Sequence, residues 1–496
     1  MNRDQESDRK PLPFSFSTLS GATYVYDDLS GVILPAVGPV ARLAENADGP
    51  EADSLIQGVF GRYREAAARN RPPVRPWTPE RVKQDTLLAP SLQVTLIVTE
   101  RCTLRCRYCV YTGTYDYSRS HSGADMSLET AIRAVDYLAA RYKERERHNP
   151  GRTPALGFYG GEPLLRLDLI RKVVEHVSRI GLKCSFNVTT NGTVCDDETI
   201  EFLAKNDFNV AVSLDGPPGE HDRNRIFPDG RGSFSYAYGL LAKLRSARER
   251  YGAGQPGQTP YVILSCADRA TDFQVLREFF DSDPGTFAKS GARVSMIYPY
   301  RTSYYDGWSE ENLRRAERTA SAMWPEYLEA AAAQDRPDAM SFAGTMFGLP
   351  LRGLLSSLCS DISPMRGACV PGSRLAVDPA GRLHICERVN NNYAIGDVER
   401  GLDLEVVVEM QNALQSYIQD HCADCGVKRL CGACFSHALV DKPMNVEIPA
   451  DFCRQTPKGC RNNLGSLFTI LERNPASLAS FQSSVDEIEQ DRIFNG

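Results

Sequence analysis

Thr99-Glu100-Arg101-Cys102-Thr103-Leu104-Arg105-Cys106-Arg107-Tyr108-Cys109 is the most informative stretch of this 496-residue chain. Its cysteines form a C-x3-C-x2-C run, which follows an apolar, strand-like segment, Leu92–Val98. Cubane iron–sulfur clusters normally take four cysteine thiolates. Three thiolates close together would hold three irons and leave the fourth open to chelate a small molecule. The run therefore indicates chemistry rather than electron storage.

Two simpler interpretations exist for the same three cysteines. They could share one face of a helix as small buried residues. They could also bind zinc, which usually takes four ligands. The motifs further along the chain favour the cluster over both.

The spacing, with an aromatic Tyr108 directly before the third cysteine, resembles the radical S-adenosylmethionine (SAM) superfamily. The resemblance implies that Cys102, Cys106 and Cys109 bind a [4Fe–4S] cluster whose open iron chelates SAM, with Tyr108 at the cofactor site. It also implies a cellular one-electron reductant of the flavodoxin or ferredoxin type. The reduced cluster would split SAM into methionine and a 5′-deoxyadenosyl radical.

The composition is that of an ordinary globular protein, with 42% hydrophobic and 24% charged residues. A net charge of −6 gives no basic footprint for nucleic acid. No apolar run is long enough to predict a membrane span, and Met1–Lys10 lacks the apolar core of a signal peptide. We therefore expect a cytoplasmic protein, in which 15 cysteines favour metal binding or catalysis over disulfides.

Six short segments rich in Val, Ile, Phe and Tyr alternate with helix-like segments, which predicts βα units and a parallel sheet. The six segments are Leu92–Val98, Ala155–Tyr159, Ser185–Thr189, Val210–Leu214, Tyr261–Ser265 and Val294–Tyr298. The fold class is α/β, and the resemblance implies a partial (β/α)6 barrel of the TIM type. Functional residues of such barrels lie at the C-terminal ends of the strands.

Polar motifs follow three of these predicted strands. Gly160-Gly161-Glu162-Pro163 follows the second strand, and the glycines would let the backbone approach a ligand closely. The resemblance implies that Gly160, Gly161 and Glu162 hold the SAM amino group; the alternative is a tight turn. It also implies contacts of Asn191, Ser213 and Arg225 with the SAM ribose and carboxylate, although Asn-Gly and Asp-Gly are ordinary turn dipeptides and the Arg could form a surface ion pair.

The segment from Cys359 to Cys460 carries nine of the cysteines and resembles the SPASM domain, which binds two auxiliary [4Fe–4S] clusters. It departs from that family in having two residues, not three, between Cys431 and Cys434. The resemblance assigns Cys369, Cys386 and Cys434 to a first auxiliary cluster and Cys422, Cys425, Cys431 and Cys453 to a second, which makes three clusters in all.

This scheme leaves the roles of some cysteines undecided. Cys359 is either the fourth ligand of the first auxiliary cluster or absent from it, leaving an open iron there, and Cys460 is unassigned. Structural zinc is the rival for the whole block, but five residues between the two C-x2-C pairs are few for a zinc ribbon. Cys184, Cys195 and Cys266 are expected only to pack.

Glu387 follows Cys386 directly. Anaerobic sulfatase-maturating enzymes share this architecture and have an Asp after the matching cysteine as general base. Glu387 is therefore a candidate catalytic residue. The alternative is an ion pair with Arg388 or Arg374.

The segment from Val110 to Ser122 resembles maturases of Cys-rich ribosomal peptides. We therefore expect an enzyme that abstracts hydrogen from a ribosomally made precursor peptide and forms a thioether or C–C cross-link. The alternatives are an anaerobic sulfatase-maturating, formylglycine-forming enzyme, an enzyme that cross-links a subunit of a redox enzyme, and a non-catalytic iron–sulfur electron carrier.

The chain is expected to divide into seven segments. Residues 15–72, a hairpin followed by two helices, would form a precursor-peptide recognition module; the alternative is that they merely cap the open barrel. The full division is a disordered tail at 1–14, this module at 15–72, a linker at 73–90, the radical SAM core at 91–305, a helical linker at 306–358, the SPASM domain at 359–465 and a C-terminal tail at 466–496.

Overall fold

The computed structural model describes most of the chain. The described residues are 12–45, 52–70, 75–89, 92–116, 119–251, 261–287, 292–333, 341–359, 369, 371–388, 392–439 and 445–477. The expected disordered tail at 1–14 lies outside them except for its last three residues, of which Phe14 already belongs to a strand.

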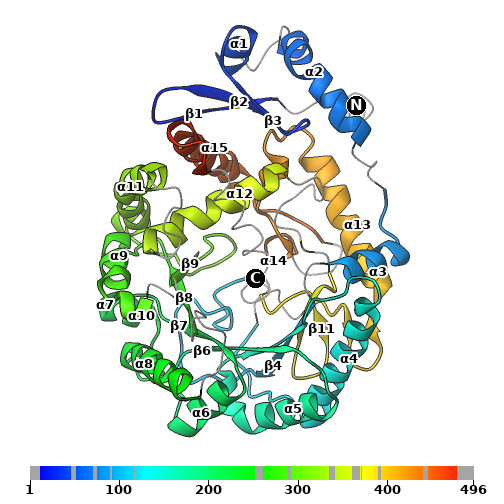
Figure 1. Cartoon of the computed structure of the whole chain (residues 1–496), viewed down its shortest axis with the longest axis vertical. Coiled ribbons are helices and arrows are strands. Elements are labelled where there is room, and N and C mark those ends of the chain that lie inside the picture. Colours follow the sequence, from blue (N-terminus) through cyan, green and yellow to red (C-terminus); the bar gives the residue numbers. More distant parts are fainter. Residues whose placement is uncertain are drawn as a thin grey trace.

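A parallel sheet of six strands forms one end of the molecule, in the order β4-β5-β6-β7-β8-β9 (Figure 1). All six predicted strands and the α/β fold class are confirmed. The strand bounds are β4 (Gln93–Thr99), β5 (Ala155–Gly160), β6 (Ser185–Thr190), β7 (Asn209–Ser213), β8 (Tyr261–Ala267) and β9 (Ala292–Met296). Every residue of β4 is buried, as expected for a parallel strand covered on both faces.

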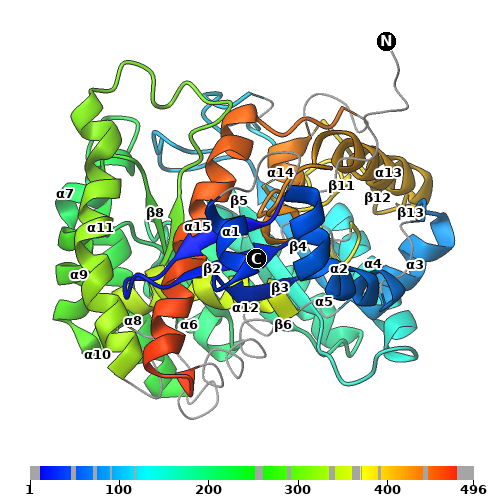
Figure 2. The same ribbon diagram turned by 90° about the horizontal axis from the view of Figure 1, so that it is seen from above.

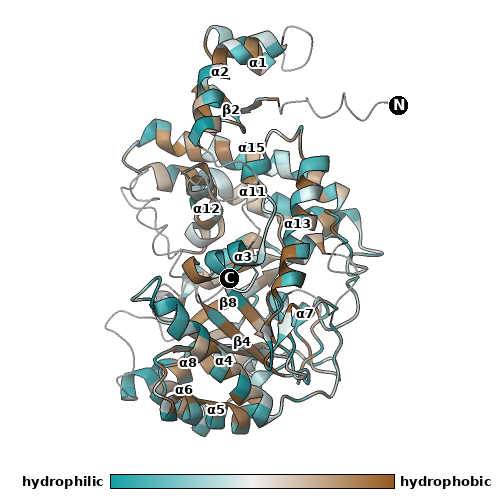
Figure 3. Cartoon of the chain, turned by 90° about the vertical axis from the view of Figure 1, so that its right-hand side faces the viewer, coloured by the Kyte–Doolittle hydropathy of each residue, from teal (hydrophilic) through white to brown (hydrophobic). Residues whose placement is uncertain are grey.

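Helices surround this sheet on its outer side (Figure 1). They are α4 (Leu128–Glu146), α5 (Leu167–Arg179), α6 (Asp197–Lys205), α7 (Pro218–Asn224), α8 (Phe234–Tyr251), α9 (Phe273–Ser282) and α10 (Pro284–Phe287). Ser127 caps α4 by accepting a hydrogen bond from the Thr130 N–H. In Figure 3 the strands of this sheet are largely hydrophobic, and the helices turn hydrophilic faces outward.

Two strands from the C-terminal region extend the sheet beyond β4. β10 (Arg374–Val377) pairs with β4 in parallel, and β11 (Leu383–His384) pairs with β10 antiparallel. The sequence analysis did not predict this extension. It places Cys386 and Glu387, which come just after β11, at the edge of the sheet that contains the barrel strands, with β10 between β11 and β4.

A separate antiparallel sheet near the N-terminus has three strands, β1 (Phe14–Ser17), β2 (Thr23–Asp27) and β3 (Val32–Pro35). The predicted hairpin thus has a third strand before it. One face packs on α1 (Pro39–Glu45) and α2 (Ala52–Asn70), and the other on α15 (Ala450–Arg473), which crosses the sheet in Figure 2. The Phe468 ring of α15 lies 5.2 Å from the Phe16 ring and 4.7 Å from the Tyr24 ring.

The remaining elements connect these parts. The expected linker at 73–90 contains a helix, α3 (Pro79–Leu88), capped by Thr78. α15 continues past residue 465 into the segment expected as a tail. The others are α11 (Glu310–Ala333), α12 (Leu349–Cys359), β12 (Gly396–Asp397), β13 (Gly401–Leu402), α13 (Leu404–His421) and α14 (Phe435–Ala438). In the described ranges, no helix combines the length and the apolar character needed to cross a membrane.

Candidate active site

The cysteine-rich loop after β4 ends in a turn at Cys106–Cys109, and buried and exposed residues alternate from Leu104 to Tyr108. Leu104, Cys106 and Tyr108 are buried, whereas Arg105 and Arg107 are exposed. Two backbone hydrogen bonds hold the loop against the end of α7, from the Arg105 N–H to the Ile226 carbonyl (2.7 Å) and from the Arg107 N–H to the Asn224 carbonyl (3.0 Å). The loop therefore turns its thiols inward and its arginines outward.

The three thiols of this loop belong to one buried cluster of side chains together with Tyr108. Burial raises the pKa of the Cys102 thiol to about 11. Thiols whose pKa is raised stay protonated and neutral unless a positive charge lies close to them. They fit a cationic iron–sulfur centre, because metal binding requires deprotonated thiolates and supplies the compensating charge.

Gly160 and Gly161 let the end of β5 pack closely against the start of the cysteine loop. The Gly161 N–H donates to the Thr99 carbonyl and the Glu162 N–H to the Arg101 carbonyl, both at 2.8 Å. A Cβ on Gly160 would lie 2.1 Å from the Thr99 oxygen, and one on Gly161 would lie 2.1 Å from the Arg101 oxygen. Gly160 also has a φ of +143°. Only glycine permits this approach of two backbones.

The Glu162 carboxylate is fully buried and links three segments. Its Oε1 accepts hydrogen bonds from the Leu164 N–H (3.1 Å) and the Thr190 hydroxyl (2.8 Å), and its Oε2 accepts one from the Asn191 N–H (2.8 Å). A carboxylate has about four acceptor sites, so Oε2 keeps one for a further donor. Burial, opposed by these hydrogen bonds, raises the pKa of Glu162 to about 7.

Asn191 and Ser213 stand at the ends of the next two strands. The Asn191 side-chain amide donates to the Thr103 hydroxyl (3.2 Å) and lies 3.5 Å from the Cys102 sulfur. Ser213 ends β7 and is 9% exposed. The sequence motifs after β4, β5 and β6 thus meet around Cys102, and a bound SAM would contact groups from all three.

Arg225 lies on the inner side of the cysteine loop and is 8% exposed. Its Nε donates to the Asp215 carboxylate (2.9 Å), and its guanidinium lies 5.4 Å from the centre of the Tyr108 ring. Tyr108 donates its hydroxyl to the same carboxylate. The geometry supports a structural contribution of Arg225 to the loop; its expected contact with SAM stays a prediction.

Asp215 is the residue that the sequence analysis overlooked. Besides Arg225 and Tyr108, it accepts a hydrogen bond from the Cys266 N–H (2.9 Å), and its own N–H donates to His221 Nδ1 (3.2 Å). Asp215 thereby ties the cysteine loop to β8. Asp215 precedes a glycine, and Asp-Gly is an ordinary turn dipeptide. The signal that could have identified Asp215 is its position at the end of a barrel strand.

Glu387 and Arg388 reach the site from the β10–β11 hairpin. The Glu387 carboxylate lies 3.8 Å from the Arg388 guanidinium, and the Glu387 side chain is 14% exposed. Burial and the nearby charge of Glu387 raise the pKa of Tyr159, which stands at the end of β5. Glu387 therefore faces the barrel opening while also paired with Arg388, and the catalytic role predicted for it remains a prediction.

Four of the C-terminal cysteines lie near one another, and the split of the ligands between two auxiliary clusters stays a prediction. Cys422, Cys425, Cys431 and Cys453 are near enough to raise one another's pKa values electrostatically. Cys369 is exposed, Cys386 is half-buried, and the side chain of Cys359 lies outside the described part. Cys460 is buried in the main core, where it packs. Within the described ranges no three His, Cys, Asp or Glu side chains form a site for a single metal ion.

Cys434 differs from Cys422, Cys425, Cys431 and Cys453 in that its pKa is lowered. Burial raises its pKa, but hydrogen bonds from His437 (3.7 Å) and Ser436 (2.9 Å), with the charge of His437, outweigh burial and bring the pKa to about 7. The His437 ring stacks on Tyr298, just after β9, at 4.0 Å. Cys434 is thus turned toward the barrel and suits a thiolate ligand.

Comparison with known proteins agrees with this geometry. Residues 96–251 match the family model of the Radical SAM superfamily, so this part of the chain is a radical SAM domain. The serine-type anaerobic sulfatase-maturating enzyme of Klebsiella aerogenes is 24% identical over 68% of this chain and 77% of its own length. The radical SAM cyclopropyl synthase TigE of Paramaledivibacter caminithermalis is 25% identical over 44% of each chain.

Some further matches are shorter, and others concern the fold alone. The chain spans 37% and 36% of the lengths of two further curated relatives. Among solved structures, native anSMEcpe with bound AdoMet and Cp18Cys peptide superposes with a TM-score of 0.55 at 19% identity, over 79% of this chain and 100% of that one. At this identity the match shows the fold alone.

Proposed function

Because the chain contains a radical SAM domain and is an enzyme of the SPASM and sulfatase-maturase type, we propose that it modifies a ribosomally made precursor peptide. When bound, the cluster and SAM supply a 5′-deoxyadenosyl radical that abstracts hydrogen from an unactivated carbon. The product is a thioether or C–C cross-link. A one-electron reductant of the flavodoxin or ferredoxin type serves the cluster.

The chain's own residues have separate roles in this proposal. Cys102, Cys106 and Cys109 hold the cluster, and the free acceptor site of Glu162 receives the SAM ammonium. Asn191 orients the cofactor beside Cys102. The side-chain amide nitrogen of Asn191 lies 3.5 Å from the Cys102 sulfur. The β10–β11 hairpin with Glu387 closes the barrel opening, which keeps water from the reaction.

The observation that carries peptide modification is the outer edge of β3. The Ala36 N–H donates to the Thr23 carbonyl (2.8 Å), and bonded and non-bonded pairs alternate along an antiparallel ladder. Ile33 and Pro35 therefore take non-bonded positions, and the Ile33 N–H and carbonyl point away from β2. A precursor segment can add to this edge as a further strand.

The opposite edge of the same sheet is occupied. α15 packs against β1, and Arg461 of α15 donates to the Ser15 carbonyl (3.1 Å). Among the described residues no strand pairs with the outer edge of β3, whereas the opposite edge is covered, and this supports docking of a peptide along β3.

A matched pair of substitutions tests this docking. Ile33→Ala and Ile33→Pro both remove the side chain, but only proline removes the outward N–H. We expect the proline variant to bind a short precursor peptide, encoded beside the gene, about tenfold more weakly than the alanine variant. Equal affinity of the two variants for that peptide would contradict docking on β3.

The reaction itself is tested by the product. Mass spectrometry of the treated peptide should show loss of hydrogen and a link that joins two residues. The sulfatase-maturase alternative is supported equally by the curated relatives, but Glu387 after Cys386, where those enzymes are expected to have Asp, counts against it. A formylglycine on a sulfatase peptide, detected by its reaction with a hydrazide, would establish that alternative instead.

A further inference from the structure

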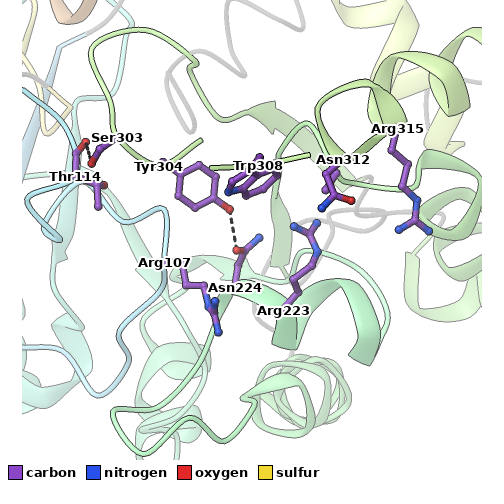
Figure 4. A pocket seen from close by; sticks show the side chains of 10 residues that line it. Arg107, Thr114, Arg223, Asn224, Ser303, Tyr304, Trp308, Asn312 and Arg315 are labelled. Atoms are coloured by element: carbon purple, nitrogen blue, oxygen red, sulfur yellow. Dashed lines mark hydrogen bonds between the residues drawn. The ribbon is translucent and has the colours of Figure 1, made fainter. Parts of the chain in front are cut away.

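A hollow lies on the outer side of the cysteine loop, away from Cys106. It has a volume of about 430 Å³, and among the described residues that line it are Arg107, Arg223 and Arg315 but no acidic side chain. In Figure 4, Tyr304, Trp308 and Asn312 form one side of the hollow, and Arg107, Asn224 and Arg223 form the other.

Two of the three arginines are already neutralised. Arg223 forms ion pairs with Asp268 (2.5 Å) and Glu220 (2.8 Å), and Arg315 pairs with Asp272 (3.0 Å). These pairs fix the shape of the hollow but leave little net charge.

Arg107 is different. It is exposed, and within the part of the chain that the structure describes no carboxylate pairs with it. Arg105, on the same side of the loop, donates only to the carbonyls of Cys102 and Leu104. The outer surface of the loop is therefore locally positive on a chain whose net charge is −6.

The position of Arg107 matters because of its neighbour. The exposed Arg107 directly follows the buried Cys106 in the chain, within the turn that the Cys109 N–H closes by donating to the Cys106 carbonyl (3.0 Å). The guanidinium of Arg107 is therefore exposed close to a predicted ligand of the cluster. Electron transfer weakens steeply with distance, and the hollow marks a short route from the surface to that cluster.

From this arrangement we infer that the hollow beside Arg107 is the docking site for an acidic electron-donor protein. The inference rests on the proposed function, since it names where that function's reductant binds. An exposed carboxylate of the donor pairs with Arg107, and the aromatic rings of Tyr304 and Trp308 give the contact an apolar part. One electron then passes from the donor to the oxidised cluster. Small, weak, salt-sensitive contacts are typical of such encounters.

Charge variants of Arg107 test the site, with a reduced flavodoxin as the probe. The measured quantity is the rate constant of cluster reduction in the cluster-loaded protein at low ionic strength. We expect Arg107→Glu to lower it about tenfold or more and Arg107→Lys to retain it. The difference should shrink as salt is added. Lys183→Glu, a charge reversal at an exposed position just before β6, is the matched control and should have no effect.

A second measurement separates docking from damage to the cluster. Dithionite-driven SAM cleavage and the cluster's midpoint potential should be the same in all variants. An unchanged flavodoxin rate in Arg107→Glu overturns the inference. The inference is also overturned if Arg107→Glu is slowed equally with flavodoxin and with dithionite. It is overturned as well if precursor binding weakens while the flavodoxin rate is unchanged. Absence of dithionite-driven cleavage in the wild type would instead contradict the proposed function.

Discussion

The carboxylate of Glu162 is shared between the turn after β5 and the end of β6, and it keeps one acceptor site free. Its pKa of about 7 lies above the ordinary value of 4.5 because burial penalises the charged form. Pairing with the SAM ammonium requires that charged form. Binding at lower pH must therefore remove a proton from Glu162 first.

This requirement predicts the pH dependence of SAM binding to the cluster-loaded protein. Below about pH 7, where free Glu162 is protonated, the affinity should rise with pH by up to about tenfold per unit, and binding should release protons. Above about pH 8 it should fall, because the SAM amine loses its own proton. Titration calorimetry in buffers of different ionisation enthalpy measures both effects.

Glu162→Gln supplies the comparison for that measurement. The amide cannot ionise, so the rise below pH 7 and the proton release should disappear, and binding should be weaker at pH 7. If Glu162→Gln keeps the same rise of affinity with pH, another group is responsible for it.

At the level of single elements, the six barrel strands were predictable because their signals are local. Each is a short run of β-branched and aromatic residues between turn residues. The same local pattern, Phe-Ser-Phe-Ser, marks β1, and the sequence analysis overlooked it. α3 was missed because the Pro- and Arg-rich residues before it favoured a linker, although Thr78 and Pro79 form an ordinary helix start.

Other features could not be predicted from local sequence. β10 pairs Arg374 with Gln93, residues distant along the chain, and β11 has only two residues. The two glycines were expected to let the backbone approach a ligand. In the structure the backbone that lies close to Gly160 and Gly161 is that of Thr99 and Arg101. Asp215 depends in the same way on partners from separate segments. Contacts of this kind follow from packing, not from composition.

The glycine pair leads to a prediction about stability. Gly161→Ala should lower the free energy of unfolding by about 3 kcal/mol, because its Cβ would meet the Arg101 backbone oxygen, which cannot move aside cheaply. Gly239→Ala is the matched control, since Gly239 lies inside α8 with nothing within 4 Å of an added Cβ. It should be neutral or stabilising by up to about 1 kcal/mol.

Chemical denaturation of both alanine variants measures these changes. A Gly161→Ala protein as stable as Gly239→Ala would contradict the close approach of β5 to the cysteine loop.

At the scale of the whole molecule, the N-terminal sheet and α15 bring the two ends of the described chain together. Phe14, Phe16 and Tyr26 belong to the same buried core as the barrel, while Val25 and Phe60 form a smaller core with α1 and α2. The sheet is therefore part of the main body on one face. A deletion of residues 1–72 would expose Phe468, so a gentler change is needed to test what the sheet does.

Phe468→Ala is such a change. It removes the ring between Phe16 and Tyr24 and should cost about 2 kcal/mol, less than for a fully buried phenylalanine. We expect weaker precursor binding with unimpaired dithionite-driven SAM cleavage. Leu19→Ala is the control, because Leu19 follows β1, contacts α15 through its backbone N–H and has a side chain that is 61% exposed. Equal precursor binding by Phe468→Ala and Leu19→Ala would argue against a role of the sheet in docking.

The distribution of cysteines predicts the metal content of the whole chain. Three cubane clusters would give about twelve irons, because each takes three or four of the grouped cysteines. Iron, sulfide and zinc analysis of anaerobically prepared protein measures this. About four irons, or stoichiometric zinc, would exclude the two auxiliary clusters.

The central claim is that Cys102, Cys106 and Cys109 hold the cluster that cleaves SAM. The most direct measurement is 5′-deoxyadenosine formed from SAM and dithionite by the anaerobically reconstituted protein, compared with a variant in which these three cysteines are alanine. The wild type should form 5′-deoxyadenosine, and the variant should form none and contain about four fewer irons. A triple variant that still forms 5′-deoxyadenosine would contradict the claim.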